Sequence, residues 1–159
     1  MKKFKEVYIL GIGGSGMSSI AKYLIQQKID VSGYDQRKSF ITNQLNQDGI
    51  KVDFNISNLK YSKEILYIYS SAISIKDTML RNNLDSDNVL SRPEFLNMLT
   101  KENKIIGITG THGKTSTTAL LAHIFHYNAK NVSYIFGGIT SFHGIGGHYG
   151  DKNQPIYRN

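Results

Sequence analysis

Two glycine-rich segments of this chain have residue types and spacing that suit phosphate binding. The first runs from Gly11 to Gly16 with the spacing Gly-x-Gly-x-x-Gly, and it follows the apolar run 7–10. In a dinucleotide site these glycines allow a tight turn and a close approach of the backbone to pyrophosphate. The spacing alone leaves NAD, FAD and a UDP-sugar open as ligands, and a tight turn without a ligand is the alternative.

The second segment has the physical features of an ATP phosphate loop. It reads Gly110-Thr-His-Gly113-Lys114-Thr115 and follows the apolar run 105–108. Backbone N–H groups of such a loop surround phosphates, the lysine ammonium neutralises them, and the threonine hydroxyl binds Mg²⁺. Ile108 stands where the usual pattern has its first glycine, so Gly110 must supply the flexibility. A structural lysine after a tight turn is the alternative interpretation.

The acidic and histidine residues give weaker signals. Asp35 lies about twenty residues beyond the first loop, where an acid can accept a hydrogen bond from ribose, although a solvated turn residue is an equal alternative. His123 and His126 have no acidic or thiol partner nearby in sequence, which favours packed or surface roles. His143 and His148 flank a glycine-rich stretch, for which a substrate contact is the less favoured interpretation.

Composition narrows the class of protein. The chain has 159 residues, a net charge of +7 and no cysteine. Its lysines are scattered, which favours a solvated surface over a nucleic-acid interface. The sequence contains no long apolar run and no signal-peptide pattern, so we expect a cytoplasmic protein without a membrane partner.

Strands alternate with helices, which predicts a parallel, doubly wound α/β sheet. Ser91, Pro93 and Glu94 form a helix-start signal for a helix over 93–100. We predict a Rossmann-like domain over 1–100 and an incomplete ATP-binding domain over 101–159. The expected strands are 7–10, 31–34, 50–54, 65–69, 89–90, 105–108 and 132–136, and the other expected helices are 17–25, 40–47, 76–84 and 114–127.

The predicted second domain, residues 101–159, is too small to cover both faces of a parallel sheet. We expect it to end in a glycine-rich tail and to expose apolar surface. It is therefore predicted to be mobile, docked elsewhere or self-associating through its sheet edge.

Taken together and in order, five motifs resemble those of the bacterial Mur ligases. The resemblance spans the whole chain and rests on Ile9-Leu10-Gly11-Ile12-Gly13-Gly14-Ser15-Gly16-Met17-Ser18-Ser19-Ile20-Ala21, Val31-Ser32-Gly33-Tyr34-Asp35, Ser70-Ser71-Ala72-Ile73, Ser91-Arg92-Pro93-Glu94 and Gly110-Thr111-His112-Gly113-Lys114-Thr115.

The resemblance implies a ligase of peptidoglycan precursor synthesis. It implies a UDP-sugar site at Gly11, Gly13, Gly14, Ser15, Gly16, Met17, Asp35, Ser70, Ser71 and Arg92. It implies an ATP site at Gly110, Thr111, His112, Gly113, Lys114, Thr115 and Ser116. In this assignment Lys114 is the catalytic residue and Thr115 reaches Mg²⁺.

The reaction implied by the resemblance activates the lactyl carboxylate of UDP-N-acetylmuramate as an acyl phosphate, which the amine of L-alanine converts to an amide. The composition of the first loop favours a ligase that catalyses this reaction over the related murein tripeptide ligase. The family continues into a strand with an acidic Mg²⁺ ligand and an amino-acid domain, so we expect this polypeptide alone to be inactive. A nicotinamide-dependent oxidoreductase and a nucleotide-sensing module are the competing functions that the residues leave open.

Overall fold

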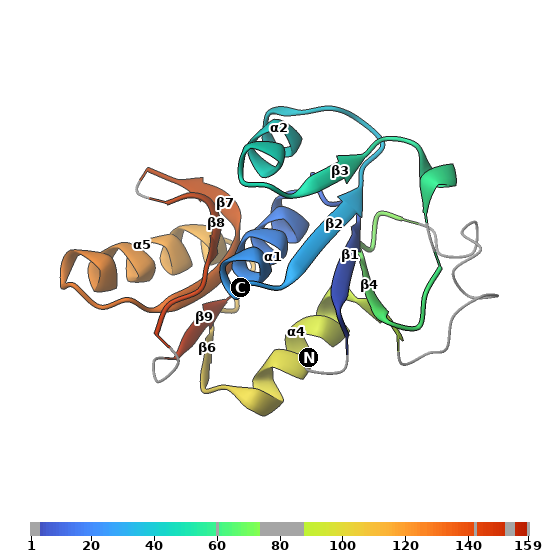
Figure 1. The fold of residues 1–159 in the computed structure, drawn as a ribbon. Coiled ribbons are helices and arrows are strands. Elements are labelled where there is room, and N and C mark those ends of the chain that lie inside the picture. The colour runs from blue at the N-terminus through green and yellow to red at the C-terminus, as the bar shows by residue number, and fades with distance from the viewer. Residues whose placement is uncertain (1–3, 60, 74–87, 142, 152–154, 159) are drawn as a thin grey trace.

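The computed structural model describes residues 4–59, 61–73, 88–141, 143–151 and 155–158. Two sheets lie on either side of helix α1 (Ser15–Gln26), as Figure 1 shows. The helix predicted over 76–84 lies outside the described residues.

The first sheet contains five parallel strands in the order β3-β2-β1-β4-β5. β1 pairs with β2 and β4 on its two sides, so Val7 lies between Val31 and Leu66. Apolar residues in consecutive positions suit a strand that is buried on both faces. The bounds are β1 Glu6–Leu10, β2 Asp30–Tyr34, β3 Lys51–Asp53, β4 Ile65–Tyr69 and β5 Val89–Ser91.

Helices α1, α2 and α4 pack on one face of this sheet, where their apolar residues share a core with Val7 and Ile9. Tyr8 and Leu10 point to the other face and pack with Tyr67. The bounds are α1 Ser15–Gln26, α2 Phe40–Gln47 and α4 Arg92–Glu102, with a short 3-10 turn η1 at Ile56–Asn58. The prediction of an α/β fold with a parallel sheet is confirmed.

The start of α4 confirms the helix signal in the sequence. The Ser91 hydroxyl accepts from the Glu94 amide, and the Glu94 carboxylate accepts from the Ser91 amide at 2.6 Å. This capping box satisfies two backbone donors reciprocally at the first turn. The helix therefore begins at Arg92, one residue before the expected Pro93.

The second sheet has four strands in the order β6-β9-β7-β8, and only β8 is antiparallel to its neighbour. Helix α5 (Lys114–Tyr127) packs against β7 and β9 and has the expected bounds. The prediction that the glycine-rich stretch is a tail is wrong, because this stretch forms strand β8. The bounds are β6 Ile105–Gly107, β7 Ser133–Thr140, β8 Gly144–His148 and β9 Ile156–Arg158.

Helix α1 joins the two sheets, since it packs on the first sheet and also against β7 and β8 (Figure 1). Ile135, Ile145 and Ile156 of the second sheet belong to the same apolar cluster as the first sheet's core. Of the three outcomes expected for residues 101–159, docking on another element is the one observed.

The second region still exposes apolar side chains, as expected from its small size. Leu120 and Tyr127 on α5 are 59% and 83% exposed, and Ile139 on β7 is 57% exposed. No described helix combines the length and apolar character needed to cross a bilayer.

Candidate functional site

The first glycine turn lies where β1 ends and α1 begins, and the protein itself uses several of its amides. Gly11 and Ile12 donate to the carbonyl oxygen of Tyr34, at 2.8 and 3.1 Å, and Gly14 donates to Gly11 O at 3.0 Å. The Gly13 amide donates to Asp35 Oδ2 at 2.8 Å. Asp35 therefore holds the loop in shape, and the ribose contact expected of it stays a prediction.

The unclaimed amides of this turn are those at the start of the helix. Among the described residues, Ser15 and Gly16 have no assigned acceptor for their N–H groups, whereas Met17 donates to Gly14 O. Two free amides at a helix N-terminus favour an anion. The amides available to an anion are therefore those of Ser15 and Gly16, and not those of the whole segment 11–16.

A cavity of about 640 Å³ opens beside the turn. Gly11, Gly13, Gly14, Asp35 and Ser70 line it among other residues. Its volume lies within the range of small-molecule sites, roughly 300–1,000 Å³. The structure therefore gathers five of the ten residues predicted for the UDP-sugar around this cavity.

Arg92 extends from the start of α4 to the backbone of the first turn. A Cβ atom added at Gly16 would lie 2.8 Å from Arg92 Nε, so glycine at this position makes room for the guanidinium. Burial lowers the pKa of Arg92, and the nearby cation Arg158 lowers it further. A guanidinium stays protonated under these conditions, so the region attracts an anion.

Arg158, at the end of β9, was not predicted. Its Nε atom is buried without a hydrogen-bond partner among the described residues. No local pattern in the sequence places Arg158 near Arg92, because Arg92 begins helix α4 and Arg158 ends strand β9, far apart in the chain.

The second glycine turn precedes α5, whose N-terminus has no side-chain cap. Gly113 has φ of +77°, in the left-handed region that glycine adopts without strain. Among the described residues, the N–H groups of 111–114 have no assigned backbone acceptor. Lys114 Nζ instead donates to the carbonyl oxygens of Gly110 and Thr111, at 2.6 and 3.1 Å.

A second cavity, of about 430 Å³, lies between the two turns. The first turn contributes Ser15 and Gly16, and the second contributes Lys114 and Thr115. The other residues that line it are Gly14, Met17, Ser70, Ser71, Arg92 and Gly137. Of these, Gly137 was not predicted. The remaining predicted residues of the second turn, Gly110, Thr111, His112, Gly113 and Ser116, do not line it.

Three of the histidines, His126, His143 and His148, lie together at the β7–β8 hairpin. The rings of His143 and His148 stack at 4.3 Å, and His126 contacts His143 edge-on at 5.0 Å. Burial lowers the pKa of His148 to about 4, with the neighbouring His143 and His126 adding to the shift. None of the three lines either cavity beside the glycine turns, and the described residues contain no metal-binding cluster of His, Cys, Asp or Glu.

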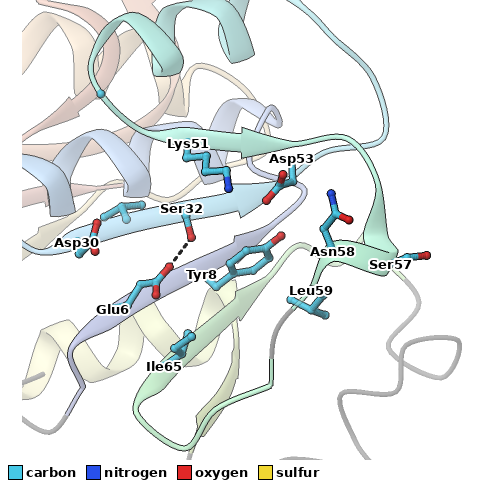
Figure 2. A pocket seen from close by; sticks show the side chains of 12 residues that line it. Glu6, Tyr8, Asp30, Ser32, Lys51, Asp53, Ser57, Asn58, Leu59 and Ile65 are labelled. Atoms are coloured by element: carbon cyan, nitrogen blue, oxygen red, sulfur yellow. Dashed lines mark hydrogen bonds between the residues drawn. The ribbon is translucent and has the colours of Figure 1, made fainter.

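Figure 2 shows a third cavity, of about 680 Å³, whose lining side chains come from β1 to β4 and from the 3-10 turn η1. Ser32 Oγ donates to Glu6 Oε1 at 2.5 Å there, and Tyr8, Lys51 and Asp53 also line it. Burial and the nearby carboxylates of Asp53 and Glu6 raise the pKa of Tyr8. This cavity contains none of the predicted site residues.

The fold and the two turns define an α/β protein with two candidate phosphate loops facing one cavity. The family model described as "Mur ligase family, catalytic domain" matches residues 6–104. The chain belongs to this family.

Relatives of the chain carry one recurrent name. A UDP-N-acetylmuramate–L-alanine ligase of Cytophaga hutchinsonii is 39% identical over 142 residues, which cover 85% of this chain and 30% of the relative. One from Hydrogenobaculum sp. is 36% identical over 146 residues, covering 90% and 32%. The chain thus spans about a third of the length of these relatives.

Solved structures have the same fold. The UDP-N-acetylmuramate-alanine ligase of Thermotoga maritima superposes with a TM-score of 0.78 at 26% identity, covering 96% of this chain and 36% of that one. A UDP-N-acetylmuramate:L-alanyl-gamma-D-glutamyl-meso-diaminopimelate ligase from Neisseria meningitides gives 0.82 at 23% identity, covering 98% and 52%. The second likeness shows the fold alone.

Proposed function

We propose that this chain supplies the UDP-sugar site and the ATP phosphate loop of a ligase that joins L-alanine to UDP-N-acetylmuramate in peptidoglycan precursor synthesis. The observation that carries the proposal is the cavity of about 430 Å³ that both glycine turns line. Two anionic substrates that must react with each other need such a shared space.

The UDP-sugar is assigned to the first turn. Its pyrophosphate binds at the free amides of Ser15 and Gly16, with Arg92 as the counter-charge. The cavity of about 640 Å³ takes the nucleoside beside Asp35. Gly11, Gly13, Gly14, Met17, Ser70 and Ser71 complete the site.

ATP is assigned to the second turn, where the residues fit a triphosphate. The unclaimed amides of 111–114 provide donors, and Lys114 is already directed onto its own loop. Thr115 is the residue that would hold Mg²⁺, which supplies positive charge to the phosphates when bound. Gly110, His112, Gly113 and Ser116 complete the loop, and Lys114 exchanges its carbonyl partners for phosphate oxygens.

The chemistry follows from bringing two anions together. The lactyl carboxylate of the sugar attacks the γ-phosphate, ADP leaves, and the acyl phosphate formed is attacked by the amine of L-alanine, which expels phosphate. Carboxylate and phosphate repel each other, so neutralisation by Lys114 and Arg92 and alignment by the two turns carry the catalysis.

The proposal includes an organisation into a UDP-sugar-binding domain over 1–100 and part of an ATP-binding domain over 101–159. It places the protein in the cytoplasm, where both nucleotide substrates are made, with small molecules rather than nucleic acid or membrane as partners. We expect these 159 residues by themselves not to form the amide.

Calorimetry on this chain tests the two sites separately. UDP-N-acetylmuramate should bind, and NADH should not compete with it. Lys114→Ala should abolish MgATP binding while leaving the sugar nucleotide's affinity within about twofold, because a point charge on phosphate is lost at one site only. No heat with millimolar UDP-N-acetylmuramate, or NADH binding in its place, contradicts the proposal.

Self-association through the second sheet is part of the same proposal. Ile106 on the edge strand β6 is 45% exposed, and an unpaired apolar edge favours pairing with another copy. Sedimentation velocity should show dimers that Ile106→Lys disperses. A chain that sediments as a monomer at all concentrations argues against this part.

A further inference from the structure

Strand β7 passes between the two phosphate turns. Its adjacent glycines Gly137 and Gly138 lie at the point where the strand contacts both turns. The pairing of β7 with β8 is shifted between Ile135 and Ile139, so the strand is irregular where Gly137 and Gly138 stand. A bulge of this kind re-aims a strand locally.

Each of the two glycines contacts a different turn. A Cβ atom at Gly137 would lie 3.0 Å from Ser15 Oγ and 3.6 Å from Gly16 N, on the first turn. A Cβ atom at Gly138 would lie 3.1 Å from Thr115 Cγ2, on the second turn. Consecutive residues of one strand therefore separate the two turns without any side chain between them.

The strand that carries this pair is held firmly against α1. Ser19 Oγ donates to the carbonyl oxygen of Phe136, the residue just before the pair, at 2.5 Å. On β8, Gly147 lies so close to α1 that an added Cβ would be 1.9 Å from Ser19 O. Because β7 is fixed on this side, extra bulk at the pair must displace the turns.

We propose that Gly137 and Gly138 are positioning residues that set the distance between the bound UDP-sugar and ATP. The inference rests on the proposed function. Phosphoryl transfer needs the reacting atoms about 3–3.5 Å apart, and a misplacement of about 1 Å costs on the order of 10²-fold in rate. The two glycines act through the turns and do not touch the reacting atoms.

The test compares Gly137→Ala, Gly138→Ala and Gly138→Val with Gly107→Ala and Gly107→Val as matched controls. Gly107 lies on β6 of the same sheet, and a Cβ there meets no atom within 4 Å. Neither the pair nor Gly107 has a positive φ, so alanine changes bulk and not backbone preference. Alanine at the pair requires its neighbours to give by a few tenths of an ångström, and valine requires more.

The readout is the distance between the two ligands on the wild-type and variant chains. Mn²⁺ with the β,γ-imido analogue of ATP is bound together with UDP-N-acetylmuramate, and the paramagnetic relaxation of the sugar protons is measured. Relaxation depends on the inverse sixth power of distance, so it is sensitive to small displacements. Separate calorimetric titrations report the affinity for each ligand.

Support is a loss of relaxation enhancement in both alanine variants, a larger loss in Gly138→Val, and wild-type values in the Gly107 controls. Unchanged relaxation in variants that bind both ligands overturns the inference. So does a loss confined to one ligand's affinity with the inter-ligand distance preserved.

Failure of the underlying function is recognised before any variant is compared. A wild-type chain that binds neither ligand overturns the proposed function, and the positioning role falls with it. Amide chemical shifts of the ligand-free variants give a second readout. Gly137→Ala should perturb Ser15 and Gly16, and Gly138→Ala should perturb Thr115. Shifts that stay at wild-type values overturn the assigned contacts.

Discussion

The two glycine turns have similar compositions but differ in what binds their amides. In the first turn, the amides of Gly11 and Ile12 bond to Tyr34, and that of Gly13 bonds to the Asp35 carboxylate. In the second turn, residues 111–114 have no assigned backbone acceptor within the described chain, and Lys114 bonds to carbonyls of its own loop.

The difference shows two ways to organise the backbone of a glycine turn before a helix. The first turn is organised by the protein, which leaves only the amides of Ser15 and Gly16 for a ligand. The second turn is exposed, and the N–H groups of 111–114 have no assigned backbone acceptor among the described residues. Because local stability follows the number of internal contacts, we expect the second turn to be the less rigid of the two without a ligand.

The largest effect is expected where the two regions meet. Gly147→Ala places a Cβ atom 1.9 Å from the Ser19 carbonyl oxygen, and backbone on both sides must move. We expect the free energy of unfolding to fall by about 3 kcal/mol or more, as in severe overpacking. Urea unfolding measures this, with Gly107→Ala as the control. Equal stability of the two variants would show that α1 does not hold β8.

Acid should weaken the second region selectively, because all five histidines lie within 101–159. Burial lowers the pKa of His148 to about 4, with His143, His126 and Lys22 nearby also disfavouring its charge and Asp151 favouring it. Below about pH 6.5 the unfolded chain binds a proton that the folded chain does not. Stability is therefore lost as the pH falls from about 6.5 to about 4, and it is unaffected by this group above pH 6.5.

The pH dependence of urea unfolding, measured for wild type and His148→Gln, checks this expectation. The change in the free energy of unfolding with pH should be the same for the two proteins near pH 7.5 and should differ increasingly toward pH 4. His112→Gln, on an exposed residue of the second turn, serves as the control. Parallel pH profiles for wild type and His148→Gln would remove His148 as the cause.

Hydrogen exchange should separate the two turns directly. We expect the amides of 111–114 to exchange at least about tenfold faster than those of Gly11 and Gly13, equivalent to about 1.4 kcal/mol of local opening. MgATP should slow exchange in the second turn and leave the first unchanged. Equal protection of the two turns without ligand would show that they are equally organised by the protein.

The smallest effect concerns how the neighbouring helices begin. α4 is capped by Ser91 and Glu94, whereas α5 follows Gly113 without a side-chain cap. Ser91→Ala should lower the free energy of unfolding by about 1 kcal/mol, because a helix N-cap is lost. Thermal unfolding measures it, and MgATP affinity should stay the same. Ser141→Ala, at an exposed turn position outside both candidate sites, is the control.

Local signals predicted most of the elements. The bounds of α2 and α5 follow from apolar periodicity and turn residues, and the Ser91–Glu94 spacing located the start of α4 within one residue. The same signals failed for β8. Its glycines are typical of a mobile tail, but they form a strand because the missing side chains let the backbone approach α1.

The candidate site likewise has features that the sequence predicts and features that only the tertiary structure decides. The positions of both glycine turns, of Lys114 and of the helix starts that follow the turns were determined by the sequence, since each depends on residues within a few positions of one another. Tertiary structure alone decided that Asp35 bonds to Gly13, that Arg92 lies on Gly16, and that Gly137 and Gly138 stand between the turns. These contacts join segments far apart in the chain, and their geometry depends on packing that no local pattern encodes.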